Sequence, residues 1–216
     1  MSDYDLEQLL RDELTWDPKL DAKAIGVMAD DGVVTLRGNV SSFRQKREAS
    51  KDAERVARVR KVVNKLDVQI LDRDRRDDSE LRGAVLQALM LDTVVPSTID
   101  VEVADSFVTL TGTSNWRFER DEAEFVASNV PGVISVINDV DIVPRAPTAA
   151  DLKHSIETAM DRNAKLDADS VSVESSNGTV TLRGTVSSWA DHDEAVSAAW
   201  AAPGVSRVKD HILVAY

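Results

Sequence analysis

The 216-residue sequence contains no cysteine, which excludes disulfide bridges, thiolate metal ligands, thiol nucleophiles and a lipid anchor carried on cysteine. It also contains no window approaching the roughly 18 consecutive apolar residues that a membrane-spanning helix needs. The first 17 residues carry acids where a secretory signal carries a basic head and an apolar core. We therefore expect a cytoplasmic protein, or a periplasmic one if a signal once preceded Met1.

Basic residues are outnumbered by acidic ones. The chain has 26 lysines and arginines against 38 aspartates and glutamates, a formal net charge of −12 at pH 7. This charge repels a polyanion, and the aromatic residues, only 5% of the chain, do not alternate with basic residues, so we predict no nucleic-acid partner. Hydrophobic residues nevertheless make up 43% of the chain, which is enough apolar mass for a core and argues against wholesale disorder.

The chain does contain one pattern that occurs three times. The segment GVVTLRG ends at Gly38, FVTLTG ends at Gly112 and GTVTLRG ends at Gly184. Apolar residues before and after these glycines recur in register: Leu6, Leu81 and Leu152, then Ala49, Ala123 and Ala195. We predict an α+β fold of three tandem α-β-β-α-β domains, over residues 1–72, 77–144 and 147–216. Each domain is expected to be a small three-stranded mixed sheet packed against two helices.

Dipeptides between the first two strands of each copy predict hairpin turns. Asp31-Gly32 and Asn177-Gly178 suit a tight turn in which both central residues need a positive φ. The second copy has Asp105-Ser106 instead. Because serine tolerates positive φ poorly, we expect a looser or different turn there.

Helix boundaries follow from capping residues and periodicity. The N-cap and N3 spacing of a capping box occurs before the first helix of each copy, in Ser2 with Asp5, Asp77 with Glu80 and Thr148 with Asp151. The second helices are expected at about residues 44–58, 118–129 and 190–202.

The three copies resemble the BON domain. The resemblance rests on the α-β-β-α-β order, on the G-x-V-x-L-x-G strand and on the tail seen as GVISVIND from Gly132. The first copy departs from the tail pattern, with Arg58 where Gly132 and Gly204 stand in the others. The resemblance implies a non-catalytic module, mostly found in the bacterial envelope, associated with osmotic-shock protection and thought to bind phospholipid surfaces. A cytoplasmic relative joined to a LysM domain senses potassium, so small-cation binding is a further alternative.

A search for catalytic or metal-ligating groups identifies none. The histidines His154, His192 and His211 fall in different parts of the third copy, without a recognisable partner set. The acids of the DHDE segment at residues 191–194 are typical of a solvated helix start rather than of a cation site. We therefore predict no enzyme activity, no metal site and no cofactor.

Basic residues gather on the second helix of the first copy. Five of them, which we call the basic ridge, follow three- and four-residue steps and span about 80° of helix surface: Arg44, Arg47, Lys51, Arg55 and Arg58. They are expected to face water opposite an apolar stripe of Ala49, Ala53, Val56 and Ala57.

Two interpretations of the basic ridge stay open. One is a solvated face, tempered by local pairing with Glu48, Asp52 and Glu54. The other is a surface that faces anions, either phospholipid headgroups or the acidic surface of a protein partner or a second copy of this chain. The acids on the second helix of copy two suit the latter role: Glu119, Asp121, Glu122 and Glu124.

Tryptophans on the second helix of the third copy are candidate anchors. Trp200 corresponds to Glu54 and Ser128 in the other copies, so the common core does not require an aromatic side chain there. Trp200 and Trp189 are either anchors for a partner or membrane interface, or side chains packed at the edge of the core. Trp16, near the end of the first helix, is expected to pack locally.

Overall fold

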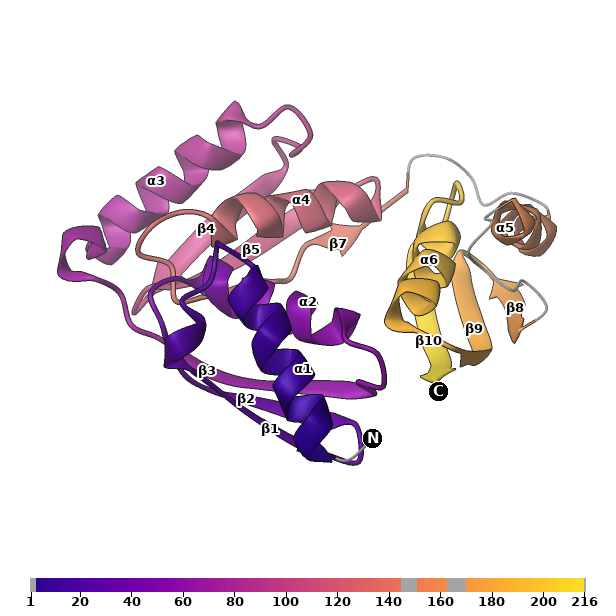
Figure 1. Ribbon diagram of the computed structural model, residues 1–216. Helices are drawn as coiled ribbons and strands as arrows, with labels where there is room; N and C mark the ends of the chain where they lie inside the picture. The colour runs from indigo at the N-terminus through magenta and orange to yellow at the C-terminus, as the bar shows by residue number, and fades with distance from the viewer. Residues whose placement is uncertain (1–2, 145–150, 163–169, 216) are drawn as a thin grey trace. The chain divides into compact units, whose positions relative to one another are not determined.

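The computed structural model describes residues 3–144, 151–162 and 170–215 of the chain. The first domain runs through α1 (Asp3–Trp16), a short 3-10 turn at Ala22–Ala24, β1 (Ile25–Asp30), β2 (Val33–Val40), α2 (Phe43–Arg55) and β3 (Lys61–Val68), as Figure 1 shows. Strand β2 lies between β1, to which it is antiparallel, and β3, to which it is parallel. The three-stranded mixed sheet is therefore confirmed.

The second domain repeats this order after a second 3-10 turn at Asp72–Asp74. Its elements are α3 (Asp78–Leu91), β4 (Ile99–Ala104), β5 (Phe107–Ser114), α4 (Arg117–Ser128), β6 (Ser135–Asn138) and β7 (Asp141–Ile142). Both β6 and β7 pair parallel to β5. The last strand of this domain is thus interrupted at two residues, Asp139 and Val140.

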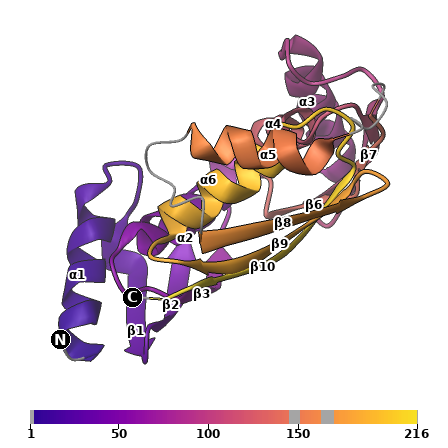
Figure 2. The same ribbon diagram turned by 90° about the vertical axis from the view of Figure 1, so that its right-hand side faces the viewer.

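The third domain contains α5 (Leu152–Asp161), β8 (Val171–Ser176), β9 (Thr179–Val186), α6 (Trp189–Trp200) and β10 (Arg207–Val214). Its sheet has β9 in the centre, antiparallel to β8 and parallel to β10. Figure 2 shows both helices of this domain on one face of the sheet. The α+β class and the threefold α-β-β-α-β order are confirmed.

Each domain buries the same apolar positions. Five places in the repeat are fully buried in all three copies, on the first helix, the middle strand and the second helix: Leu10, Val85 and Ile156; Val34, Val108 and Val180; Leu36, Leu110 and Leu182; Ala49, Ala123 and Ala195; Ala53, Ala127 and Ala199. Burial of a leucine or valine side chain stabilises a fold by roughly 1.5–3 kcal/mol. The small alanines allow the second helix to lie close to the sheet.

The three hairpin turns adopt the same conformation, so the expected difference in the second copy is wrong. Asp105 and Ser106 both have positive φ, 52° and 65°, like Asp31-Gly32 and Asn177-Gly178. The carboxylate of Asp78 accepts hydrogen bonds from the backbone N–H groups of both Asp105 and Ser106, each at 2.9 Å. These two bonds offset the cost of positive φ at serine, which a dipeptide rule does not include.

The middle-strand glycines permit a close backbone approach. Gly38, Gly112 and Gly184 have positive φ, and a Cβ atom on Gly38 would lie 2.0 Å from the carbonyl oxygen of Ala24. No other residue fits such a position without moving the backbone. The glycine is therefore required by the structure in every copy.

Helix starts agree with the capping pattern in one copy and differ in another. Asp77 caps α3 by accepting from the backbone N–H of Glu80, as expected. In the third copy Asp151 is the N-cap and accepts from His154 N–H, although Asp151 was expected at N3. Ser2 and Thr148 lie outside the described residues.

The chain forms two compact units. One comprises residues 1–112 and 121–139, and the other comprises residues 113–120 and 140–216. The domain boundaries expected from the repeats stay a prediction. Within the described ranges, no helix has both the length and the apolar character that crossing a membrane requires.

Candidate functional site on helix α2 of the first domain

Helix α2 carries the basic ridge and presents two faces with different chemistry. Ser42 caps the helix by accepting a hydrogen bond from Gln45 N–H at 3.2 Å. Ala49 and Ala53 are fully buried against the sheet. The helix ends at Arg55, three residues before the expected end, and Val56 is in an extended conformation. Val56 is buried there, but Ala57 is exposed, so the expected apolar stripe is shorter.

Because α2 ends at Arg55, Arg58 lies in the turn after the helix and is not part of the basic ridge. Arg58 has a φ of 74°, and the matching glycines of the other domains have 105° at Gly132 and 85° at Gly204. Arg58 thus adopts the left-handed conformation that glycine provides elsewhere. Its expected place on the helical stripe is wrong because the chain leaves the helix before it.

The remaining four ridge residues divide into two cations without an acidic partner among the described residues and two that have partners. Arg44 and Lys51 are exposed, and the described residues show no acidic partner for either. Arg47, with a side chain only 25% exposed, donates to the hydroxyl of Ser128 on α4 at 2.8 Å and lies 3.8 Å from the Glu124 carboxylate. Arg55 contacts Asp52 at 2.6 Å and Glu13 at 3.2 Å. The ridge is therefore not a uniform solvated stripe.

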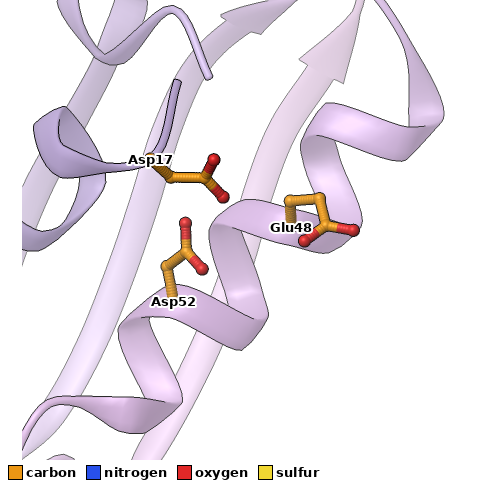
Figure 3. A group of neighbouring side chains, drawn as sticks. All are labelled: Asp17, Glu48 and Asp52. Carbon is orange, nitrogen blue, oxygen red and sulfur yellow. The ribbon is translucent and has the colours of Figure 1, made fainter. Parts of the chain in front are cut away.

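Next to Arg55 lies a group of three carboxylates, which we call the acidic triad. Asp17 follows the end of α1, and Glu48 and Asp52 lie one turn apart on α2. One oxygen from each lies within 4.8 Å of the others. Figure 3 shows the carboxylates of Asp17 and Asp52 pointing toward one another, with Glu48 beside them.

Lys19 and Arg55 provide the positive charge around the acidic triad. Lys19 Nζ lies 3.3 Å from Asp17 Oδ2 and 3.2 Å from Glu48 Oε2, so it bridges two of the three acids. Lys19 N–H also donates to Asp17 Oδ1 at 2.9 Å. Glu48 was expected to pair with a residue of its own helix, but it pairs with Lys19 because the loop after α1 passes over α2.

Burial makes Asp52 the most perturbed member of the acidic triad. Its side chain is completely buried, in contrast to the solvated position expected from the sequence. Burial raises the pKa of Asp52 to about 6, and the charges of Asp17 and Glu48 add to this effect while Arg55 opposes it. The backbone N–H of Lys19, together with its ammonium group, lowers the pKa of Asp17.

The repeats show that Asp52 is peculiar to the first domain. Counted from the aligned alanine, its position holds Val126 in the second domain and Ala198 in the third. The Glu48 position is Glu122 and Glu194 in these domains, so one acid is common to all three. Our sequence interpretation missed Asp17 and Asp52 as a pair. The sequence did contain one indication, because Asp52 is charged at a position where the second and third domains have apolar residues.

Trp200 lies at the edge of its core, one of the two alternatives expected for it, whereas Trp16 differs from the expectation. Trp200 is half-buried and packs against the core of the third domain. Trp189 is also half-buried, with its ring edge-on to His192 at 4.9 Å between centroids. Trp16 was expected to pack locally, but it is 85% exposed on α1 because the chain turns away after Asp17.

His192 joins two acids at the start of α6. Its Nε2 lies 2.7 Å from Asp210 on β10, and its Nδ1 lies 3.0 Å from Asp193. These acids raise the pKa of His192, although burial opposes the shift. The helix start is partly solvated, with the Asp193 side chain 75% exposed, and His192 links it to Asp210 on β10.

Comparison with known proteins supports the family resemblance. The BON domain family matches residues 2–70, 77–144 and 148–216. Osmotically-inducible protein Y of Escherichia coli (strain K12) is 38% identical over 125 residues, which cover 54% of this chain and 60% of that protein.

Solved structures give weaker similarities. The C-terminal domain of CdsD, the structural protein of the type III secretion system of Chlamydia trachomatis, is 13% identical with a TM-score of 0.26 and full coverage of both chains. The PrgH periplasmic domain is 11% identical with a TM-score of 0.24, covering 95% of this chain and 99% of that one. The assignment therefore depends on the family match and the shared fold of the repeats. On these grounds the chain belongs to the BON domain family and carries three copies of the domain in tandem.

Proposed function

We propose that this protein is a non-catalytic binding module of the BON type that protects against osmotic or envelope stress by peripheral association with an anionic phospholipid surface. Membership of the family and the similarity to osmotically-inducible protein Y support the stress-related role. The observation that carries the phospholipid surface is the pair of exposed cations on α2, Arg44 and Lys51, for which the described residues show no acidic partner. An exposed basic residue at an anionic membrane contributes about 1 kcal/mol.

Arg47 and Arg55 add little to the attraction for anionic lipids. Arg47 is held by α4 through Ser128, and Arg55 by Asp52 and Glu13, so both have most of their charge compensated. Trp16, exposed on α1 of the same domain, supplies an aromatic side chain suited to the membrane interface. Two cations and one aromatic side chain give weak, reversible binding rather than permanent anchoring.

Vesicle co-sedimentation tests the proposal. Wild-type protein should bind vesicles of phosphatidylglycerol and phosphatidylcholine at low salt and release them at physiological salt, because the attraction is electrostatic. The double variant Arg44→Glu, Lys51→Glu should lose binding by at least tenfold.

A second pair of cations in the same domain provides a matched control. Lys61 and Lys65 are exposed on β3, which belongs to the sheet rather than to the helical layer. The variant Lys61→Glu, Lys65→Glu changes the net charge equally and should bind nearly as well as wild type. Equal losses in both variants would contradict a specific surface on α2, and no binding at low salt would end the phospholipid proposal.

Protein interaction is the second candidate function. The contact of Arg47 with Glu124 and Ser128 shows that cations of the first domain and acids of the second are complementary within one chain. The same complementarity between two chains would give self-association. Light scattering across protein concentration and salt should then show a mass that rises at low salt, whereas a monomer throughout would exclude this form.

A further inference from the structure

The acidic triad of the first domain is built differently from an ordinary acidic surface. We propose that Asp17, Glu48 and Asp52 form a binding site for a divalent cation of the calcium type, with Lys19 as the competing positive charge. This inference goes beyond the proposed function and does not depend on phospholipid binding. It rests on the geometry of the triad, on an unpartnered buried oxygen and on the comparison between repeats.

The unpartnered oxygen is Oδ2 of Asp52. The other oxygen of this side chain accepts from Arg55 at 2.6 Å, whereas Oδ2 accepts from no N–H or hydroxyl donor although the side chain is 0% exposed, and the Asp52 carboxyl lies within hydrogen-bonding reach of the Asp17 carboxyl. Figure 3 shows this carboxylate directed at Asp17. A buried carboxylate oxygen without a partner is costly, and two carboxylates facing one another repel unless a cation or a proton lies between them.

Comparison of the three domains shows whether the fold itself requires an acid at the Asp52 position. The second and third domains build the same helix on the same sheet with Val126 and Ala198 at the Asp52 position. The second domain also has Asp92 and Glu122, which correspond to Asp17 and Glu48. The scaffold therefore does not need the third acid. Its presence in the first domain completes a set of three oxygen ligands from two segments that are distant in the sequence.

The negative charge of the acidic triad exceeds what Lys19 alone can compensate, which favours binding of a further cation. Three carboxylates face Lys19 and Arg55, and Arg55 is shared with Glu13, so at least one negative charge is uncompensated at neutral pH. Calcium accepts carboxylate oxygens in flexible arrangements, whereas magnesium requires a near-octahedral set. Three carboxylates whose ligand oxygens lie within 4.8 Å of one another therefore suit calcium better.

Lys19 sets how tightly the site binds. Its side chain is 51% exposed and lies over Asp17 and Glu48, whereas these two acids and Asp52 are 13% exposed or less. A cation that reaches the acids must displace the ammonium group. We therefore expect a weak site, with a dissociation constant of about 10⁻⁴ to 10⁻³ M.

Calorimetric titration of the full chain with CaCl₂ at constant ionic strength and pH 7.5 tests the site, with MgCl₂ and KCl as comparison salts. Wild type should release or absorb heat with calcium at one site, more weakly with magnesium, and show no saturable signal with potassium. Asp52→Asn should weaken calcium binding at least tenfold. Lys19→Met should strengthen it at least threefold, because it removes the competing charge.

A control separates the site from the general negative charge of the protein. Asp67→Asn removes one exposed acid from β3 of the same domain and should leave the calcium affinity unchanged. Asp52→Val, the residue of the second domain, provides a second loss variant that removes both oxygens. Absence of a saturable calcium signal in both wild type and Lys19→Met overturns the proposal. Equal calcium affinity in wild type and Asp52→Asn overturns it too. If the stability of the first domain then depends on pH but not on calcium, Asp17 and Asp52 share a proton instead of a metal ion. Failure of phospholipid binding has no bearing on these titrations.

Discussion

Helices α2 and α6 occupy the same place in the first and third domains, yet they differ in what they add to the common scaffold. Both bury two alanines against the sheet, Ala49 with Ala53 and Ala195 with Ala199. Beyond these positions α2 carries a buried aspartate and basic side chains, whereas α6 carries Ala198 and a half-buried Trp200. The scaffold requires close contact at the alanines, and the rest of the helix surface has diverged. Function is therefore to be sought in what differs between the domains.

The largest effect on stability is expected from substitutions in the core that all three domains share. Leu36, Leu110 and Leu182 are fully buried on the middle strands. Replacement of any one by alanine leaves a cavity and should reduce the stability of its own domain by about 2–5 kcal/mol. Thermal unfolding and hydrogen exchange of the full chain measure the losses. A loss below about 1 kcal/mol in one domain would show that the cores are not equivalent.

The second prediction concerns Asp52, which distinguishes the first domain. Because its folded pKa of about 6 lies above the unfolded value of 3.8, its stabilising contribution is complete below about pH 4 and is lost as the pH rises through 6. Asp52→Asn, which still accepts from Arg55, should stabilise the first domain at pH 7.5 by on the order of 2–3 kcal/mol and change little at pH 4.

Hydrogen exchange of the α2 amides across pH measures this difference. The groups that share the environment are Asp17, Glu48, Lys19, Arg55 and Glu13, and none of them is altered by the substitution. A variant whose stability follows the same pH dependence as wild type would contradict the assignment to Asp52.

A smaller effect is expected at His192 in the third domain. Its position holds Lys46 in the first domain and Arg120 in the second, which are permanent cations, so this domain alone has a titrating cation there. The raised pKa, caused by Asp193 and then Asp210, means that its stabilising contribution is complete at acidic pH and is lost as the pH rises through the folded pKa.

His192→Gln should therefore weaken the third domain at pH 5 but not at pH 8, by about 1 kcal/mol or less for a partly exposed pair. Histidine proton resonances followed by NMR give the pKa directly, and amide exchange gives the stability. A His192 pKa at its ordinary value would contradict the expected pH dependence of the third domain.

The smallest effect tests the hairpin of the second domain. Ser106 has the positive φ that Gly32 and Gly178 provide in the other turns. Ser106→Gly should relieve this strain and stabilise the second domain by roughly 0.5 kcal/mol, after the entropic cost of glycine. Asp78→Ala should have the opposite sign, since it removes two hydrogen bonds to the turn. Differential scanning calorimetry of the two variants shows whether the signs differ.

The sequence was most informative where one residue type answers one local requirement. The repeated glycines, the apolar register and the capping Asp77 predict the threefold fold correctly, because buried positions tolerate few side chains and turns need particular φ values. The turn at Ser106 was mispredicted, because a carboxylate from α3 stabilises it. Arg58 was mispredicted as helical, because arginine adopts the conformation of the missing glycine.

The candidate site was less accessible to sequence reasoning. Helical periodicity put Asp52 among exposed acids that pair with their neighbours, and the ridge was drawn as five equivalent cations. In the structure, the loop after α1 covers one side of α2 and α4 contacts Arg47, so the same helix surface is divided into buried, partnered and exposed parts. The comparison of repeats contains a partial signal, since Val126 and Ala198 mark the Asp52 position as apolar.

By itself, the sequence determined the number of domains, their element order, their buried positions and their family, since these follow from patterns that recur along the chain. Only the tertiary structure decided which charges meet. Asp17 approaches Asp52 and Glu48 across the packing of α1 on α2, and Lys19 is drawn to them by the same packing. Electrostatic energies depend on distance and burial, and neither quantity is written in the spacing of residues along the chain.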